Sequence, residues 1–175
     1  ELLSLASRNI ERNGLHNVEL LLGDMFKPVR DRKFDLITIN PPAMPTPPDI
    51  QRDMRNVFQV VNEGGPDGRE FVDRCLAGIS DYLKPGGRIL IVNPDFINLE
   101  ITVRIMEEKS LEIEILISEE LPLVPGDLAY QRKAYIESLG YKFTERDGNY
   151  YYRIVVISGR GKSFILYKHL INPNS

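Results

Sequence analysis

Asn40-Pro41-Pro42 is the group of residues in this sequence best suited to chemistry. It directly follows the apolar run Phe34 to Ile39, which predicts a strand. Proline lacks a backbone N–H and has a fixed φ, so the pair stops a sheet ladder and holds Asn40 extended at the carboxyl end of the strand. Ligands of open α/β sheets bind at that edge. We therefore expect a rigid shelf of hydrogen-bond acceptors, suited to a substrate that carries an N–H₂ group.

Length and composition are typical of one globular domain without a membrane span. The chain has 175 residues, of which 42% are hydrophobic and 27% are charged. Its formal net charge of -3 counts against a strongly basic nucleic-acid surface. No apolar run approaches the roughly 20 residues that cross a bilayer.

The cysteine and histidine content limits the possible chemistry. Cys75 is the only cysteine and cannot form an internal disulfide, so we expect a cytoplasmic protein. It falls on the apolar face of a predicted helix, which favours a core position over a nucleophile. His16 and His169 have no other ligand type at metal-binding spacing, so no metal site is expected.

Alternating helix and strand patterns predict the elements that position Asn40. Helical periodicity covers residues 2–13, 69–83, 98–109 and 128–139, and strand patterns cover 18–22, 34–39, 89–92 and 111–117. Asn98 is expected to cap the third of these helices. The inward stripe of the second is expected to be Val72, Cys75, Leu76, Ile79 and Leu83. Strands at 141–146 and 149–158 flank Asp147-Gly148, a hairpin signal, while 164–167 fits either an edge strand or a short helix. Residues 40–56 form a long proline-rich loop of the kind that is often functional. This order predicts an α/β fold, with a mostly parallel sheet, helices on both faces and an antiparallel C-terminal hairpin.

Several short motifs occur in this sequence in an order that is typical of one enzyme family. They are residues 9–18, Gly23-Asp24-Met25-Phe26, Phe34-Asp35-Leu36-Ile37, Asn40-Pro41-Pro42, Gly64-Gly65-Pro66-Asp67-Gly68-Arg69 and Leu83-Lys84-Pro85-Gly86-Gly87. In this order, over about residues 1–96, the sequence resembles class I S-adenosylmethionine-dependent methyltransferases. It is most similar to the branch that includes the release-factor glutamine methyltransferases. The resemblance implies a Rossmann-like methyltransferase sheet and a single domain over residues 1–175.

The resemblance also implies roles for individual residues. The Asn40 side-chain oxygen and the Pro41 carbonyl would accept hydrogen bonds from the target nitrogen, with Pro42 completing the catalytic corner. Asp24 would accept from the adenine amino group of S-adenosylmethionine, with Met25 on the ring and Asn40 also at the cofactor. Methyl transfer from a sulfonium to nitrogen is an in-line displacement that depends mainly on positioning.

The sequence departs from the family at two places. Ala43 stands where the family usually has an aromatic residue that stacks on the target group, so Ala43 and Met44 would line the substrate without that platform. Phe26, Met44 or one of the tyrosines 150–152 could take its place. The family's glycine-rich cofactor loop and ribose-binding acid lie upstream of the first helix and are not in this sequence. We therefore expect that the first strands are missing and that Glu1 is not the natural start, which an initiator methionine directly before it would refute.

Three functions stay open. The leading one is methyl transfer to an amide or amino nitrogen, above all a protein glutamine side chain. The alternatives are an adenine N6 methyltransferase acting on RNA or DNA, against which Ala43 and the net charge count, and a non-catalytic binding module. A protein substrate is favoured, a nucleic-acid partner stays open, and the oligomeric state is not set. Asp67 and Arg69 are expected to cap and orient their helix rather than contact substrate.

Overall fold

The computed structural model describes residues 2–50 and 56–162, and the chain divides into two compact units, residues 1–32 and 33–175. The single-domain assignment therefore stays a prediction. In the first unit, helix α1 (Leu2–Arg12) precedes a short 3-10 helix, η1 (Lys27–Val29). None of the residues of α1 is buried.

The strand predicted at residues 18–22 is wrong. These residues form no strand in the described part of the chain, and Leu22 is 82% exposed. An apolar run becomes a strand only when a neighbouring strand pairs with its backbone groups, and no described strand pairs with this one.

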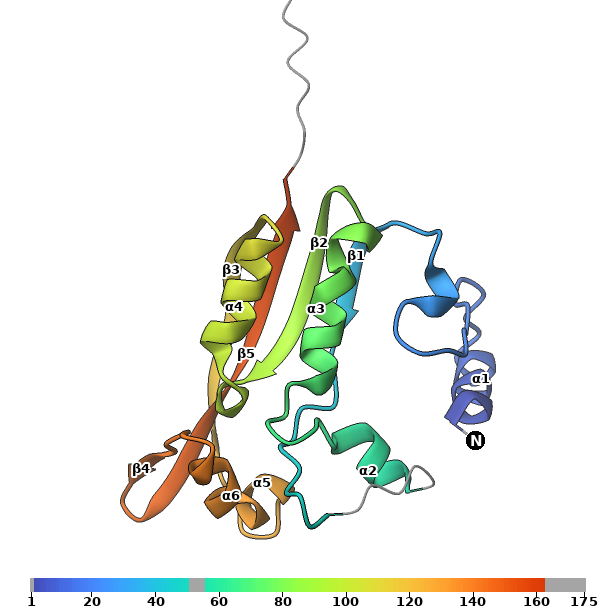
Figure 1. Cartoon of the computed structure of the whole chain (residues 1–175). Helices are drawn as coiled ribbons and strands as arrows, with labels where there is room; N and C mark the ends of the chain where they lie inside the picture. Colours follow the sequence, from blue (N-terminus) through green and yellow to red (C-terminus); the bar gives the residue numbers. More distant parts are fainter. Residues whose placement is uncertain (1, 51–55, 163–175) are drawn as a thin grey trace, which may run out of the picture. The chain divides into compact units, whose positions relative to one another are not determined.

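A five-stranded sheet is the centre of the second unit. Its path runs β1 (Phe34–Ile39), β2 (Leu83–Pro94), β5 (Asn149–Gly161) and β3 (Leu111–Pro122), and β4 (Thr144–Arg146) pairs with β5 (Figure 1). β1 and β2 are parallel, whereas β5 is antiparallel to β2, β3 and β4. The α/β class and the antiparallel C-terminal hairpin are confirmed. Among the described strands only β1 and β2 pair in parallel, so parallel pairing is less extensive than predicted, because β5 lies between β2 and β3 and is antiparallel to both.

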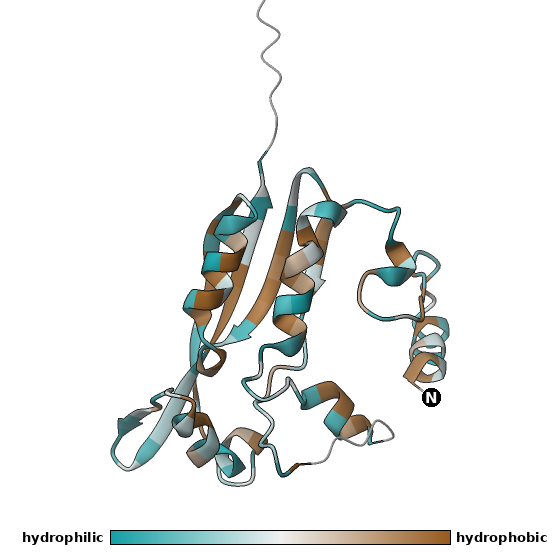
Figure 2. Ribbon diagram, in the orientation of Figure 1, coloured by the Kyte–Doolittle hydropathy of each residue, from teal (hydrophilic) through white to brown (hydrophobic). Residues whose placement is uncertain are grey.

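Two long helices cover one face of this sheet. Helices α3 (Glu70–Tyr82) and α4 (Leu99–Glu108) lie side by side on it (Figure 1). Hydrophobic residues lie along β2 and along both helices (Figure 2). The buried core includes Val72, Cys75, Leu76, Ile79, Leu83, Ile89, Ile91, Met106 and Ile157. The predicted inward stripe of α3 is therefore confirmed.

Local signals account for several element ends. Asn98 caps α4, as predicted, and its side-chain oxygen accepts from the backbone N–H of Ile101 at 3.2 Å. Asp147 and Gly148 both have positive φ, +51° and +75°, as the tight turn of the β4–β5 hairpin requires. Residues 164–167 lie outside the described residues.

Helix α2 (Val57–Asn62) was not predicted, and the helix predicted at 128–139 is two helices. These are α5 (Leu128–Gln131) and α6 (Lys133–Ser138), which meet at Arg132, where φ is −101° and ψ is 7°. α2, α5 and α6 lie beyond the carboxyl ends of β1 and β2 (Figure 1). They therefore surround the end of the sheet from which Asn40 emerges.

Gly68 and Gly148 offer a matched test of packing near this end. Both have a similar positive φ, +78° and +75°, so an added Cβ strains the backbone equally. At Gly68 that Cβ would lie 2.4 Å from the carbonyl oxygen of Ala43, whereas at Gly148 it would meet nothing within 4 Å. We predict that Gly68→Ala lowers the free energy of unfolding by about 2 kcal/mol more than Gly148→Ala, measured by urea denaturation. Equal losses would contradict the close packing at Gly68.

Candidate functional site

Asn40-Pro41-Pro42 leaves the carboxyl end of β1, just after Ile39 pairs with Ile91. Asn40 is exposed, and both prolines are half-buried. The Asn40 side chain forms no hydrogen bond with any residue that the structure describes (2–50 and 56–162). Its amide is therefore available to a ligand. The position required of a catalytic Asn40 is therefore met, while its role stays a prediction.

Backbone hydrogen bonds anchor the chain that follows the prolines. The N–H of Met44 donates to the carbonyl of Asn62 at 2.9 Å, and the N–H of Gly64 donates to the carbonyl of Met44 at 2.8 Å. The N–H of Thr46 donates to the carbonyl of Gly65 at 2.7 Å. These bonds make a short parallel bridge between the loop and the chain after α2.

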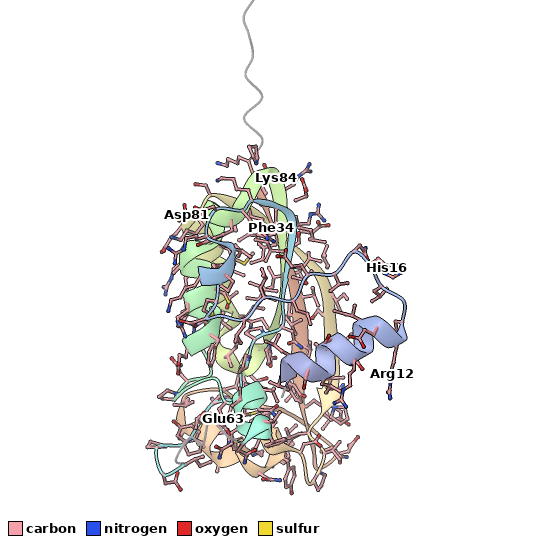
Figure 3. The ribbon with its side chains drawn as sticks, turned by 90° about the vertical axis from the view of Figure 1, so that its right-hand side faces the viewer. Arg12, His16, Phe34, Glu63, Asp81 and Lys84 are labelled. Carbon is pink, nitrogen blue, oxygen red and sulfur yellow. The ribbon has the colours of Figure 1, made fainter. Side chains whose placement is uncertain are left out.

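A buried ion pair supports the same loop. The side chains of Arg132 and Glu63 are only 7% and 3% exposed. The Arg132 Nη1 and Nη2 atoms donate to the two Glu63 carboxylate oxygens at 2.7 and 2.6 Å, and Nη1 also donates to the Pro45 carbonyl at 2.8 Å. The Thr46 hydroxyl donates to the same carboxylate at 2.5 Å. Glu63 lies at the opposite end of the unit from Lys84 (Figure 3).

The glycine turn after Glu63 packs directly on Ala43. A Cβ at Gly64 would lie 2.7 Å from the Cα of Ala43, and one at Gly68 would lie 2.6 Å from Cγ2 of Ile97. Only glycine allows the turn, the loop and the segment after β2 to approach this closely. Ala43 itself is 9% exposed, so it is a packing residue with little surface for a substrate.

The side chain of Arg69 ties the start of α3 to the start of α4. Its Nη1 donates to the carbonyls of Ile97 and Asn98 at 2.6 and 3.0 Å, and its Nη2 donates to the Asp73 carboxylate at 2.6 Å. The Asp67 carboxylate accepts from the backbone N–H of Arg69 at 3.0 Å. Arg69 stands at the N-cap position of α3 without a side-chain cap hydrogen bond. The prediction that Asp67 and Arg69 orient the helix is confirmed, whereas the predicted side-chain cap is not found.

The tyrosines named as substitutes for the aromatic platform have partners within the protein. Lys133 Nζ lies 3.9 Å from the ring centroid of Tyr150, and the Arg146 guanidinium lies 4.3 Å from that of Tyr151. The Tyr152 ring packs on Phe96 with centroids 5.4 Å apart. None of these contacts identifies a stacking surface for a substrate, so the substitute platform stays unassigned.

Asp24 and Met25 belong to the first unit and are described by themselves. The Asp24 carboxylate pairs with Lys27 at 2.9 Å and remains 45% exposed. Met25 has a left-handed backbone, with φ of +53°, which is rare for a residue with a side chain. An exposed carboxylate next to a thioether fits the amino group and the ring face of an adenine. Their cofactor role stays a prediction.

Sequence reasoning did not identify Thr46, Glu63 and Arg132. Glu63 directly precedes the glycine turn, which is a weak local signal. Arg132 is 87 residues from Pro45 along the chain, so no local pattern links them. A group of metal-ligating side chains does not occur among the described residues, and none of their helices is both long and apolar enough to cross a membrane.

Comparison with known protein families shows which family the chain belongs to. A family model described as a methyltransferase domain matches residues 1–156. The chain belongs to this methyltransferase-domain family. Its fold agrees, because the YcgJ protein of Bacillus subtilis has a TM-score of 0.57 at 17% identity, over 91% of this chain and 78% of that one.

Two curated relatives of this methyltransferase-domain protein are named as glutamine methyltransferases. It is 37% identical over 92 residues to the release factor glutamine methyltransferase of Geobacter sulfurreducens, over 51% of this chain and 32% of the relative. It is 31% identical over 120 residues to the putative protein N5-glutamine methyltransferase of Methanocaldococcus jannaschii, over 69% of this chain and 59% of the relative. The chain thus spans less than two thirds of the length of either relative.

The cysteine of this methyltransferase-domain protein provides a chemical test of the core. Cys75 is 8% exposed, and burial raises the pKa of its thiol to about 11. A raised pKa keeps the thiol protonated as the pH rises through the usual range, so little nucleophilic thiolate forms near pH 8. We predict that native protein reacts with a thiol reagent at pH 8 far more slowly than urea-unfolded protein. Equal rates would contradict the core position of Cys75.

Proposed function

We propose that the protein transfers a methyl group from S-adenosylmethionine to the side-chain amide nitrogen of a protein glutamine. The observation that carries the proposal is the exposed Asn40 amide at the carboxyl end of β1, followed by two prolines and an anchored loop. The relatives named as glutamine methyltransferases support the choice of acceptor.

The chemistry requires that an amide nitrogen be made nucleophilic. Its lone pair is delocalised into the neighbouring carbonyl, so the nitrogen is planar and weakly reactive. The Asn40 side-chain oxygen and the Pro41 carbonyl would accept hydrogen bonds from the two N–H groups of the amide nitrogen. These bonds would turn the lone pair of the nitrogen toward the methyl group. Because Pro41 and Pro42 lack backbone donors and have fixed φ, this pair of acceptors is held before the substrate arrives.

The methyl donor supplies an electrophilic methyl group on a positively charged sulfur. The nitrogen forms a bond to the methyl carbon as the carbon–sulfur bond breaks, and the nitrogen then loses one proton to solvent. Asp24 would hold the adenine amino group and Met25 would pack on the ring. The roles of these residues are binding and orientation.

Packing around Ala43 favours an amide over an adenine base. Ala43 is 9% exposed beneath the glycine turn, and Met44 is half-buried in the bridge to the chain after α2. A narrow amide needs no flat stacking surface, whereas a flipped base is usually held between aromatic or apolar side chains. We propose a protein substrate and, because the single cysteine favours a reducing compartment, a cytoplasmic setting.

The proposal is tested with the protein as its gene encodes it. We predict that it methylates glutamine-containing peptides, but not the same peptides with asparagine or adenine-containing RNA, measured by mass spectrometry with S-adenosylmethionine. Asn40→Ala should lower kcat by about 10²- to 10³-fold, the usual effect of removing one preorganised polar contact to a transition state. Asn149→Ala, at an exposed hairpin position, is the matched control and should leave kcat unchanged.

Methylation of RNA in place of the peptides would contradict the choice of acceptor. Undiminished methylation of the peptides by Asn40→Ala would contradict the role of Asn40.

A further inference from the structure

We propose that Arg132 is a positioning residue for methyl transfer, which holds the loop carrying Asn40 through Glu63 and the Pro45 carbonyl. The proposal rests on the proposed function of Asn40. Arg132 would touch neither substrate nor cofactor, and its effect would pass through the loop.

The first argument is energetic. Removing a guanidinium and a carboxylate from water is costly, and well-packed apolar residues in place of a buried ion pair are often neutral or stabilising. Arg132 and Glu63 are 7% and 3% exposed, so they lie in this regime. Fold stability is therefore a weak reason for a buried pair at this position, and a requirement for geometry is a stronger one.

The second argument is the geometry of the pair. One guanidinium nitrogen of Arg132 donates both to Glu63 at 2.7 Å and to the Pro45 carbonyl at 2.8 Å, while the other nitrogen donates to Glu63 at 2.6 Å. The planar guanidinium fixes the direction of all three bonds, which the point charge of a lysine could not do. The Thr46 hydroxyl also donates to Glu63. Two successive loop residues, Pro45 and Thr46, are therefore held by the same buried ion pair.

The third argument is the short distance along the chain. Only Ala43 and Met44 separate Pro42 from Pro45. Met44 is held by two backbone hydrogen bonds, and Ala43 lies against the glycine turn. Few torsions are free between the Arg132 contact and Asn40, so a shift at Pro45 is passed on to the acceptors. A misplacement of about 1 Å can lower a rate by about 10²-fold.

The fourth argument is that Arg132 belongs to a segment with several contacts to the site. Arg132 joins α5 to α6, in the connection between β3 and β4. From the same connection, the Tyr135 hydroxyl donates to the Pro66 carbonyl at 2.8 Å, and the Tyr141 hydroxyl donates to Asp95 at 2.7 Å. α5 and α6 lie at the same end of the sheet as α2, and Glu63 lies there too (Figures 1 and 3). The connection therefore supports three loops around the carboxyl ends of β1 and β2.

The test uses Arg132→Met combined with Glu63→Leu, which removes both charges of the buried pair together. We expect a thermal midpoint close to that of the wild type and a kcat for the glutamine peptide about 10²-fold lower, with KM for S-adenosylmethionine unchanged. Hydrogen exchange should be faster at the backbone amides of Met44 and Thr46. Arg132→Lys, which keeps the charge, should fold and recover only part of kcat.

The matched control is Lys133→Gln with Glu137→Gln, which removes a more exposed ion pair one residue along the chain. It should change neither kcat nor the exchange of the loop amides. A folded double variant with wild-type kcat would overturn the positioning role; if the double variant does not fold, wild-type kcat in Arg132→Lys would do so. If the wild-type protein methylates no peptide, the proposed function fails separately. The exchange measurement then decides, and unchanged protection of Met44 and Thr46 in the variants would overturn the positioning role.

Discussion

The candidate site depends on the contact between a proline-rich loop and a glycine turn that allows no side chain between them. The carbonyl of Ala43 lies 2.4 Å from where a Cβ on Gly68 would be, and the Cα of Ala43 lies 2.7 Å from one on Gly64. Backbone hydrogen bonds join the same two segments. Because Asn40 is held at one end by β1 and at the other by this contact, its amide can be both exposed and fixed.

The buried ion pair adds direction to this contact. Backbone packing brings the loop and the turn together, whereas the Arg132 guanidinium determines where the Pro45 carbonyl points. Replacing a buried pair of this kind by apolar residues is often neutral for stability, so we infer that this pair serves to select one arrangement of the loop. A site that acts by positioning has a direct use for that selection.

The sequence predicted the elements whose signals are local. The inward stripe of α3, the Asn98 cap and the Asp147-Gly148 hairpin depend on a few neighbouring residues, and all three are confirmed. The strand at 18–22 was wrong, since pairing depends on a partner and not on the run itself. The break at Arg132 was missed because a residue 69 positions away accepts its hydrogen bonds. The position of Asn40 was predictable because it depends on the local strand and the two prolines that follow. The network that holds its loop was not predictable, because it joins residues far apart in the sequence.

The central claim is that Asn40 and Pro41 grip the two hydrogens of an amide nitrogen. A crystal structure of the protein with a glutamine peptide and the demethylated product of the cofactor tests it most directly. The account predicts the glutamine amide nitrogen at about 3 Å from both the Asn40 side-chain oxygen and the Pro41 carbonyl. A glutamine bound with its amide turned away from both oxygens would contradict the account.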